Sequence, residues 1–243
     1  MDVGFRTDKG ARRSNNEDAF FVMKNDGVYI VADGVGGNNS GEIASRTAVN
    51  EIATYVEEHR IDPRDVRGFF LAAAQKANTR VYEMAQRYRE DKGMATTLVV
   101  ACFLNRELWI TNVGDSRVYL CDKGSMIQVT EDHTYVNALV QAGVITKDEA
   151  KHHMDKNMIT RAVGADREVE PDFYRVRLRP GLKVLLCTDG LHGEVSENEM
   201  AQIFAKGMSM TDTCRELVDA ANRNGGGDNI TAVCIEVTEE DLK

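Results

Sequence analysis

Short apolar runs separated by tight turns dominate this sequence and limit what it can fold into. Nine runs of four to eight residues are rich in Val, Ile, Leu and Tyr, and turns such as Asn25-Asp26-Gly27 lie between them. This pattern predicts β-strands at residues 19–23, 28–32, 98–103, 108–112, 117–120, 126–129, 173–178, 183–187 and 230–237. Hairpin-sized turns rather than helical crossovers join consecutive runs, so we expect mainly antiparallel sheets.

Two long amphipathic helices interrupt the predicted strands. Apolar residues of the first recur every four positions, at Ala44, Ala48, Ile52 and Val56. The second carries one apolar stripe, formed by Val66, Phe69, Phe70, Ala73, Ala77, Val81, Met84, Ala85 and Tyr88. We expect Pro63 in the first turn of this second helix, with Asp62 as its N-cap. Two more helices are expected at 197–205 and 211–222, which makes the chain an α+β protein.

Segment 134–158 departs from the strand pattern. It holds a short helix-like stretch at 135–141 and then a charged piece that contains histidines, and we interpret it as an inserted flap. No repeat, low-complexity tract or linker divides the sequence, so we expect one domain over residues 1–243.

Charge and composition narrow the classes of function. The formal net charge is −9 and there is no Lys/Arg run, which argues against nucleic acid and anionic membranes as partners. The sequence begins without the basic and apolar segments of a secretion signal, and no apolar run approaches the ~20 residues of a membrane span, so we expect a cytoplasmic protein. The five cysteines are predicted to be buried free thiols, because their number is odd and most lie in apolar runs.

Gly- and Asp-rich segments at strand ends are the candidates for a functional site, at 13–18, 32–37, 112–117, 187–190 and 226–229. A carboxylate at the end of a buried strand costs free energy unless it is capped, paired or bound to a cation. One Asp-Gly pair alone usually marks a turn. Five such segments favour a shared cation site, and oxygen ligands select Mg²⁺ or Mn²⁺ over zinc. His133 is expected to organise a turn, and a functional role stays open for His192.

These segments resemble the metal-dependent Ser/Thr protein phosphatases of type 2C, especially the compact bacterial members. The matching stretches follow the family's order and span nearly the whole chain, at 13–18, 33–37, 41–45, 93–97, 112–117, 130–133, 159–164, 186–191 and 227–231. The resemblance implies an α-β-β-α sandwich of two mainly antiparallel sheets flanked by helix pairs, with a flap insertion. It also places the metal ions in a cleft at one end of the sandwich, which the flap borders.

The resemblance further implies two tightly bound Mn²⁺ or Mg²⁺ ions. Asp33 would bridge them, Asp189 and Asp228 would complete one site, and the Gly34 carbonyl would complete the other. Glu17 and Asp18 would act on that second ion, partly through water. Two ions about 4 Å apart can share a water and lower its pKa, which yields a hydroxide able to attack phosphorus.

Two further residues have expected roles. Asp115, together with Asp189, matches the residues that hold a third, weaker cation in bacterial relatives. Arg13 matches the residue that grips the substrate phosphate, for which guanidinium offers a planar fork of donors. The expected catalytic residues are therefore Arg13, Asp33 and Asp189.

The partners expected from the resemblance are phosphorylated proteins, including a Ser/Thr kinase and its substrates, and the chain is expected to be a monomer. Alternatives are a phosphatase of one phosphorylated regulator, a catalytically weak metal-binding interaction module, and a cation-stabilised structural protein.

Two positions depart from the family pattern. Val35 stands where animal members carry a histidine proposed as general acid, so the leaving-group proton would come from a metal-bound water or from His192. Ala95 stands where the family usually has glycine.

Overall fold

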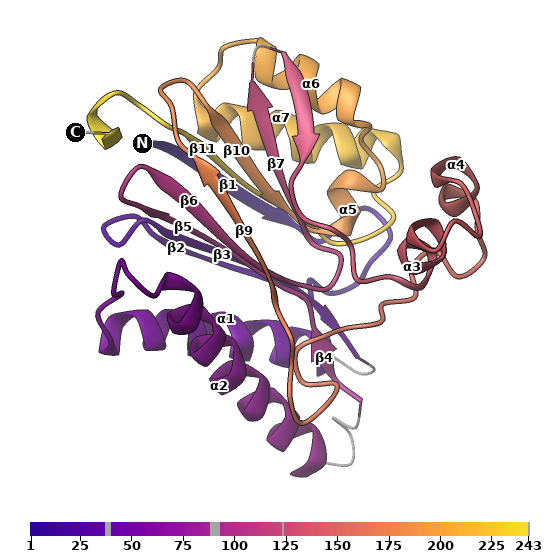
Figure 1. The fold of residues 1–243 in the computed structure, drawn as a ribbon. Helices are drawn as coiled ribbons and strands as arrows, with labels where there is room; N and C mark the ends of the chain where they lie inside the picture. The colour runs from indigo at the N-terminus through magenta and orange to yellow at the C-terminus, as the bar shows by residue number, and fades with distance from the viewer. Residues whose placement is uncertain (37–39, 88–92, 123, 243) are drawn as a thin grey trace.

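Two antiparallel β-sheets stack face to face (Figure 1) in the computed structural model, which describes residues 1–36, 40–87, 93–122 and 124–242. Sheet 1 has the strand order β1 (Asp2–Asp8), β11 (Ile230–Glu236), β10 (Lys183–Cys187), β7 (Arg117–Asp122) and β8 (Ser125–Gln128). Sheet 2 has the order β2 (Asp18–Met23), β3 (Val28–Val35), β5 (Leu98–Leu104), β6 (Glu107–Val113) and β9 (Asp172–Arg177), and the short β4 (Ala95–Thr96) pairs with β3.

Helices cover the outer face of each sheet (Figure 1). The helices α1 (Ser40–Glu58) and α2 (Val66–Arg87) pack on sheet 2, whereas α5 (Asp189–His192), α6 (Glu197–Ala205) and α7 (Met210–Asn224) pack on sheet 1. A short 3₁₀ helix, η2 (Glu240–Leu242), lies near the C-terminus. Successive residues of a strand face opposite sides of its sheet. Ile30 of β3 therefore packs under the helices, while Tyr29 and Val31 join the core between the sheets.

The flap contains α3 (Tyr135–Gln141) and α4 (Lys147–Lys151), which project beside the sandwich (Figure 1). Thr134 and Thr146 are their N-caps, and each side chain accepts a hydrogen bond from the third helical residue. Val136 is the only buried residue of these two helices. The flap therefore adds little to the core.

The structure agrees with most of the predicted elements and corrects several. Strands β1 and β4 were not predicted, and neither were the short helices α4, α5 and η2. Helix α2 begins at Val66 rather than at Pro63, and its start is capped by Asp65, whose Oδ1 accepts a hydrogen bond from the Gly68 amide at 3.0 Å. Asp62 instead accepts from the Arg64 amide, so the predicted cap was wrong.

Several other predictions can be compared with the structure. All five cysteines are free and buried, as predicted. Tyr88, at the end of the predicted stripe, and Gly37, in a predicted strand-end segment, lie outside the described residues. Within the described ranges, no helix is both long and apolar enough to cross a membrane.

Candidate metal centre

Asp18 and Asp33 lie directly opposite each other in the antiparallel pair of β2 and β3. Residues in such a pair point to the same face, with Cβ atoms about 5 Å apart. The backbone of Asp33 is fixed from the other side, because its amide donates to Thr97 Oγ1 at 2.8 Å and its carbonyl accepts from the Thr97 amide at 2.9 Å. Sheet 2 therefore holds two carboxylates side by side.

Asp18 also reaches across to sheet 1. Its Oδ2 accepts hydrogen bonds from Thr188 Oγ1 at 2.8 Å and from Thr231 Oγ1 at 2.6 Å. Its Oδ1 is buried and has no hydrogen-bond partner among the described residues, and the same is true of Asp189 Oδ1. A buried carboxylate oxygen without a donor is costly, and a cation would remove that cost.

Three further aspartates come from sheet 1. Asp189 follows β10, Asp115 precedes β7, and Asp228 precedes β11. Because β10 runs antiparallel to both β7 and β11, the end of β10 lies beside the starts of its two neighbours. The fold therefore places these three carboxylates near the same ends of neighbouring strands of sheet 1.

The pKa values show that the carboxylates influence one another. Burial, opposed in part by the two threonine hydrogen bonds, raises the pKa of Asp18 to about 7. Burial and the charge of Asp189 raise the pKa of Asp115 to about 7. Burial, and then the charges of Asp18, Asp189, Asp115 and Asp228, raise the pKa of Asp33 well above its usual value. Negative charge is thus concentrated where it is poorly solvated.

Glu17 and Gly34 meet at a close backbone approach. The Gly34 amide donates to the Glu17 carbonyl at 3.1 Å. A Cβ on Gly34 would lie 2.0 Å from the Gly41 carbonyl oxygen, and one on Gly41 would lie 2.5 Å from Glu17 Oε2. Burial raises the pKa of Glu17, and the nearby Arg13 opposes that shift. Only glycine fits at these two positions, which keeps a carbonyl and a carboxylate close together.

Arg13 lies at the edge of this cluster. Its Nη2 donates to Asp228 Oδ2 at 2.7 Å, and its side chain is 52% exposed. The preceding turn is fixed, because the amides of Ala11 and Arg12 both donate to the Gly226 carbonyl, at 2.9 and 3.1 Å. An exposed guanidinium on a fixed loop can bind an anion that enters from solvent.

The carboxylates do not form a ready-made ligand set. In the part of the chain that the structure describes, no three His, Cys, Asp or Glu side chains converge on one point as ligands of a single ion. Asp18 and Asp228 are instead turned toward their own hydrogen-bond donors. The fit to a cation rests on the two orphaned carboxylate oxygens and on the all-oxygen donor set, which suits Mn²⁺ or Mg²⁺.

Sequence reasoning missed the residues that orient the carboxylates. Asn229 is 5% exposed, accepts from the Glu17 amide at 2.7 Å, and donates to the carbonyls of Lys9 and Asn15. Thr188 and Thr231 hold Asp18 in the same way. Thr188 and Asn229 each lie next to a predicted ligand in the sequence, which is the one signal that could have indicated them, whereas Thr231 has no such neighbour.

His192 is not a suitable general acid. Its Nε2 donates to the Asp115 carbonyl at 3.1 Å. Burial and the nearby Arg117 lower its pKa to about 3, so the ring is neutral at pH 7. Val35, which is 46% exposed, has no proton to donate. The geometry gives His192 a role in holding the backbone of Asp115.

Comparison with known proteins identifies the family. The family model described as protein phosphatase 2C matches residues 8–222. The chain belongs to the protein phosphatase 2C family. The serine/threonine phosphatase stp of Listeria welshimeri is 36% identical over 241 residues, which cover 97% of this chain and 96% of that relative.

Solved protein phosphatase 2C structures share the whole fold. The serine/threonine phosphatase of S. agalactiae superposes with a TM-score of 0.92 at 33% identity, covering 97% of this chain and 98% of its own. The catalytic domain of the serine threonine protein phosphatase PstP, in complex with two manganese ions, superposes with a TM-score of 0.87 at 32% identity, covering 98% of each chain. The predicted sandwich is confirmed, and the chain is a metal-dependent protein serine/threonine phosphatase that uses Mn²⁺ or Mg²⁺.

Proposed function

We propose that the acidic residues at this end of the sandwich hold the divalent cations, and that Arg13 binds the phosphate of a phosphoserine or phosphothreonine. Asp33 would bridge two tightly bound ions, with Asp189 and Asp228 on one and the Gly34 carbonyl on the other. Glu17 and Asp18 would act on that second ion. Asp115 and Asp189 would hold a third, weaker ion. The observation that carries this proposal is that Asp18 Oδ1 and Asp189 Oδ1 are buried and have no hydrogen-bond partner in the described part of the chain, near the exposed guanidinium of Arg13.

The chain's own residues divide the work of hydrolysis. When bound, the cations supply Lewis acidity that activates water and offsets negative charge. Among the described residues, Arg13 uses one donor on Asp228 and keeps others free, and its planar fork would orient two phosphate oxygens. Water oxygen bonds to phosphorus, the bond from phosphorus to the Ser or Thr oxygen breaks, and that oxygen takes a proton. Neither Val35 nor neutral His192 can donate this proton, so of the two expected donors a water at the metal centre remains.

We also propose that the chain is one catalytic domain over residues 1–243, with the flap at 134–158. The two sheets share a continuous core, and the solved relatives match nearly the whole chain. Five buried free thiols support action in the reducing cytoplasm. We propose that the protein acts there as a monomer on phosphorylated proteins, including a Ser/Thr kinase and its substrates.

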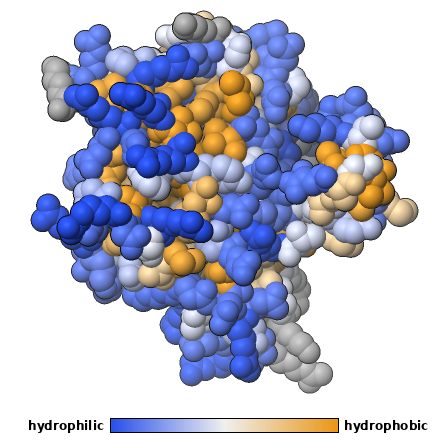
Figure 2. All heavy atoms as spheres, in the orientation of Figure 1, coloured by the Kyte–Doolittle hydropathy of each residue, from blue (hydrophilic) through white to orange (hydrophobic). Residues whose placement is uncertain are grey.

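The flap favours a narrower substrate range as the second candidate. Four of the ten large apolar side chains that are exposed in the described residues lie in the flap, at Tyr135, Val144, Met154 and Met158. Figure 2 shows apolar atoms gathered on the flap, at the right of the view. Such a surface can bind one particular protein.

The test measures hydrolysis of a phosphothreonine peptide and of p-nitrophenyl phosphate after treatment with EDTA, with and without added Mn²⁺. We expect Mn²⁺ to restore both activities in the wild type and neither in Asp189→Ala. Full Mn²⁺-dependent activity of Asp189→Ala would refute its role as a ligand. If a folded wild type binds Mn²⁺ but hydrolyses neither compound, the chain is the catalytically weak interaction module instead.

A further inference from the structure

Three side chains meet at the stem of the flap and are called here the stem clamp: His133, Arg161 and Asp172. His133 Nε2 donates to Asp172 Oδ2 at 3.1 Å. Arg161 Nη1 donates to Asp172 Oδ1 at 2.9 Å and to the Glu170 carbonyl at 2.8 Å. Both hydrogens of Nη1 are then used, so its approach to His133 Nε2 at 3.1 Å is a contact and not a hydrogen bond.

The clamp closes the flap at its base. His133 immediately precedes the flap and Arg161 follows it. The Thr160 amide donates to the His133 carbonyl at 2.8 Å, and Thr134 forms an antiparallel bridge with Ile159. Asp172 is the first residue of β9, so the clamp ties both ends of the flap to sheet 2.

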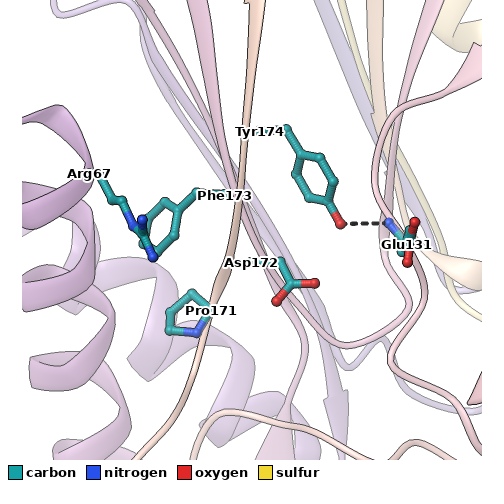
Figure 3. A pocket seen from close by; sticks show the side chains of 6 residues that line it. All are labelled: Arg67, Glu131, Pro171, Asp172, Phe173 and Tyr174. Atoms are coloured by element: carbon teal, nitrogen blue, oxygen red, sulfur yellow. Dashed lines mark hydrogen bonds between the residues drawn. The ribbon is translucent and has the colours of Figure 1, made fainter.

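The neighbouring residues of β9 support the same segment. Figure 3 shows Asp172 and Tyr174 on the side of β9 that faces Glu131, while Phe173 faces Arg67. The Glu131 amide donates to Tyr174 Oη at 3.0 Å. The chain that leads into His133 is thus held by β9 at two points.

The other side of the His133 ring contacts the metal centre. The Gly114 amide donates to His133 Nδ1 at 3.1 Å, and the His133 amide donates to the Gly114 carbonyl at 3.0 Å. Gly114 has a φ of +98°, and a Cβ there would lie 2.6 Å from Thr97 Cγ2. The next residue is Asp115, whose carbonyl is held by His192. One imidazole therefore joins the flap stem to the backbone that carries Asp115.

We infer that His133, oriented by Asp172 and Arg161, is a positioning residue that holds Gly114 and Asp115 in place for the weaker third cation. The inference rests on the proposed role of Asp115 as a ligand. A clamp that loosens would release both the flap stem and the Asp115 carboxylate. Cation affinity at this position and the closure of the flap are therefore coupled through a single ring.

Two substitutions of His133 distinguish a role in positioning Gly114 and Asp115 from a role in stabilising only the base of the flap. His133→Asn keeps an acceptor near the position of Nδ1, so the Gly114 amide stays bound. His133→Gln places its amide near the position of Nε2 and leaves Gly114 without an acceptor. We expect calorimetric titration with Mn²⁺ to show the third site weakened about fivefold to tenfold in His133→Gln, a typical size for coupling between sites. In His133→Asn it should change less than about twofold.

The flap provides a second readout that does not depend on activity. We expect faster amide hydrogen exchange at Gly114 and Thr160 in Asp172→Ala and in Arg161→Ala. Arg175→Ala is the matched control, because Arg175 is an exposed arginine on β9 that pairs with Glu107. The control should leave the exchange rates and the Mn²⁺ affinities at wild-type values.

Asp115→Asn shows whether a negative result contradicts the proposed role of Asp115 as a ligand or only the positioning role of His133. If this variant keeps the weaker Mn²⁺ site, the assignment of Asp115 is wrong and the proposed function needs another ligand. If Asp115→Asn loses the weaker site while both His133 variants keep it, the clamp does not position Asp115. Equal loss in His133→Asn and His133→Gln would also overturn the inference, because the Gly114 acceptor would then be irrelevant.

Discussion

Thr231 donates a hydrogen bond of 2.6 Å from its hydroxyl to Asp18 Oδ2, and this bond joins the first residue of β2 in one sheet to β11 in the other. The two residues are 213 positions apart in the sequence. Thr188 donates to the same oxygen. Hydroxyl groups from the opposite sheet therefore orient the carboxylate of Asp18, which is itself a candidate metal ligand.

Thr231→Val tests this relationship. Valine keeps the shape but removes the donor to a buried carboxylate, so we expect a loss of about 1.5–3 kcal/mol in the free energy of unfolding, measured by urea denaturation in EDTA. Thr231→Ser should recover most of it. Thr79→Val is the control, because Thr79 is exposed and donates only to a helix carbonyl. If Thr231→Val lowered the free energy of unfolding no more than the control does, the hydrogen bond to Asp18 would not contribute to stability.

The raised carboxylate pKa values predict a characteristic pH dependence without metal. The pKa of Asp115 is about 7 in the folded state and near 3.8 in the unfolded chain, so between these pH values the folded protein binds more protons. Its contribution to stability is therefore present at low pH and lost as the pH rises toward 7. Asp115→Asn should become more stable than the wild type over this window, by roughly 2–4 kcal/mol at pH 7.5.

When the stability of Asp115→Asn is compared with that of the wild type in EDTA, the contributions of the other titrating groups cancel. The lowered pKa of His192 acts in the opposite direction, because its stabilising effect grows as the pH rises from about 3 toward 6.5, but it is common to both proteins. Thermal unfolding at several pH values gives the difference. A difference that is constant from pH 4 to 8 would contradict the raised pKa. Added Mn²⁺ should reverse the order of the two proteins.

Arg13→Lys asks whether the guanidinium fork matters or only the charge. A lysine keeps the positive charge but cannot form two parallel hydrogen bonds with phosphate. We expect Arg13→Ala and Arg13→Lys both to raise KM for a phosphothreonine peptide by about tenfold or more, with a smaller change in kcat. Arg64→Ala is the control, since its side chain is 90% exposed and pairs with Asp62 far along the sequence from any proposed ligand. Wild-type KM in Arg13→Ala would exclude the proposed phosphate contact.

Gly34→Ala should destabilise the metal centre, because the added methyl group clashes with a neighbouring backbone segment. The added Cβ would lie 2.0 Å from the Gly41 carbonyl oxygen, so the two segments must separate, at an expected cost on the order of 3 kcal/mol. Gly207→Ala is a suitable control, because nothing lies within 4 Å of its Cβ and the cost is only the strain of its φ of +65°, about 1 kcal/mol. Equal melting temperatures of the two variants would mean that the close approach is relaxed in solution.

The sequence predicted the elements with a strong apolar pattern and missed those without one. Strand β10 and helix α6 were predicted to the residue, since buried apolar runs define them. Strand β1 was missed because it carries few apolar residues, Val3 and Phe5, while charged residues occupy the opposite face at Asp2, Arg6 and Asp8, as an exposed edge strand allows. Strand β4 is only two residues long. Pro63 suggested a helix start, but the cap is Asp65, and that choice depends on local hydrogen bonds.

The candidate site was predicted in part for a similar reason. Its carboxylates lie within, at the ends of or beside apolar strands, so their positions could be inferred from the sequence. The roles of Thr188, Thr231 and Asn229 arise only when one sheet packs on the other, because each bonds to a residue more than 40 positions away. The stem clamp likewise depends on residues from separate segments that meet at β9.

The most direct test of the account is a calorimetric titration of Mn²⁺ into the wild type and Asp33→Ala, paired with hydrolysis of a phosphothreonine peptide. Thermal unfolding in EDTA checks that the variant is folded. The account predicts two tight sites in the wild type, loss of tight binding in the folded variant, and a fall in kcat of about a thousandfold or more. A folded Asp33→Ala that keeps both tight sites and full Mn²⁺-dependent hydrolysis would contradict it.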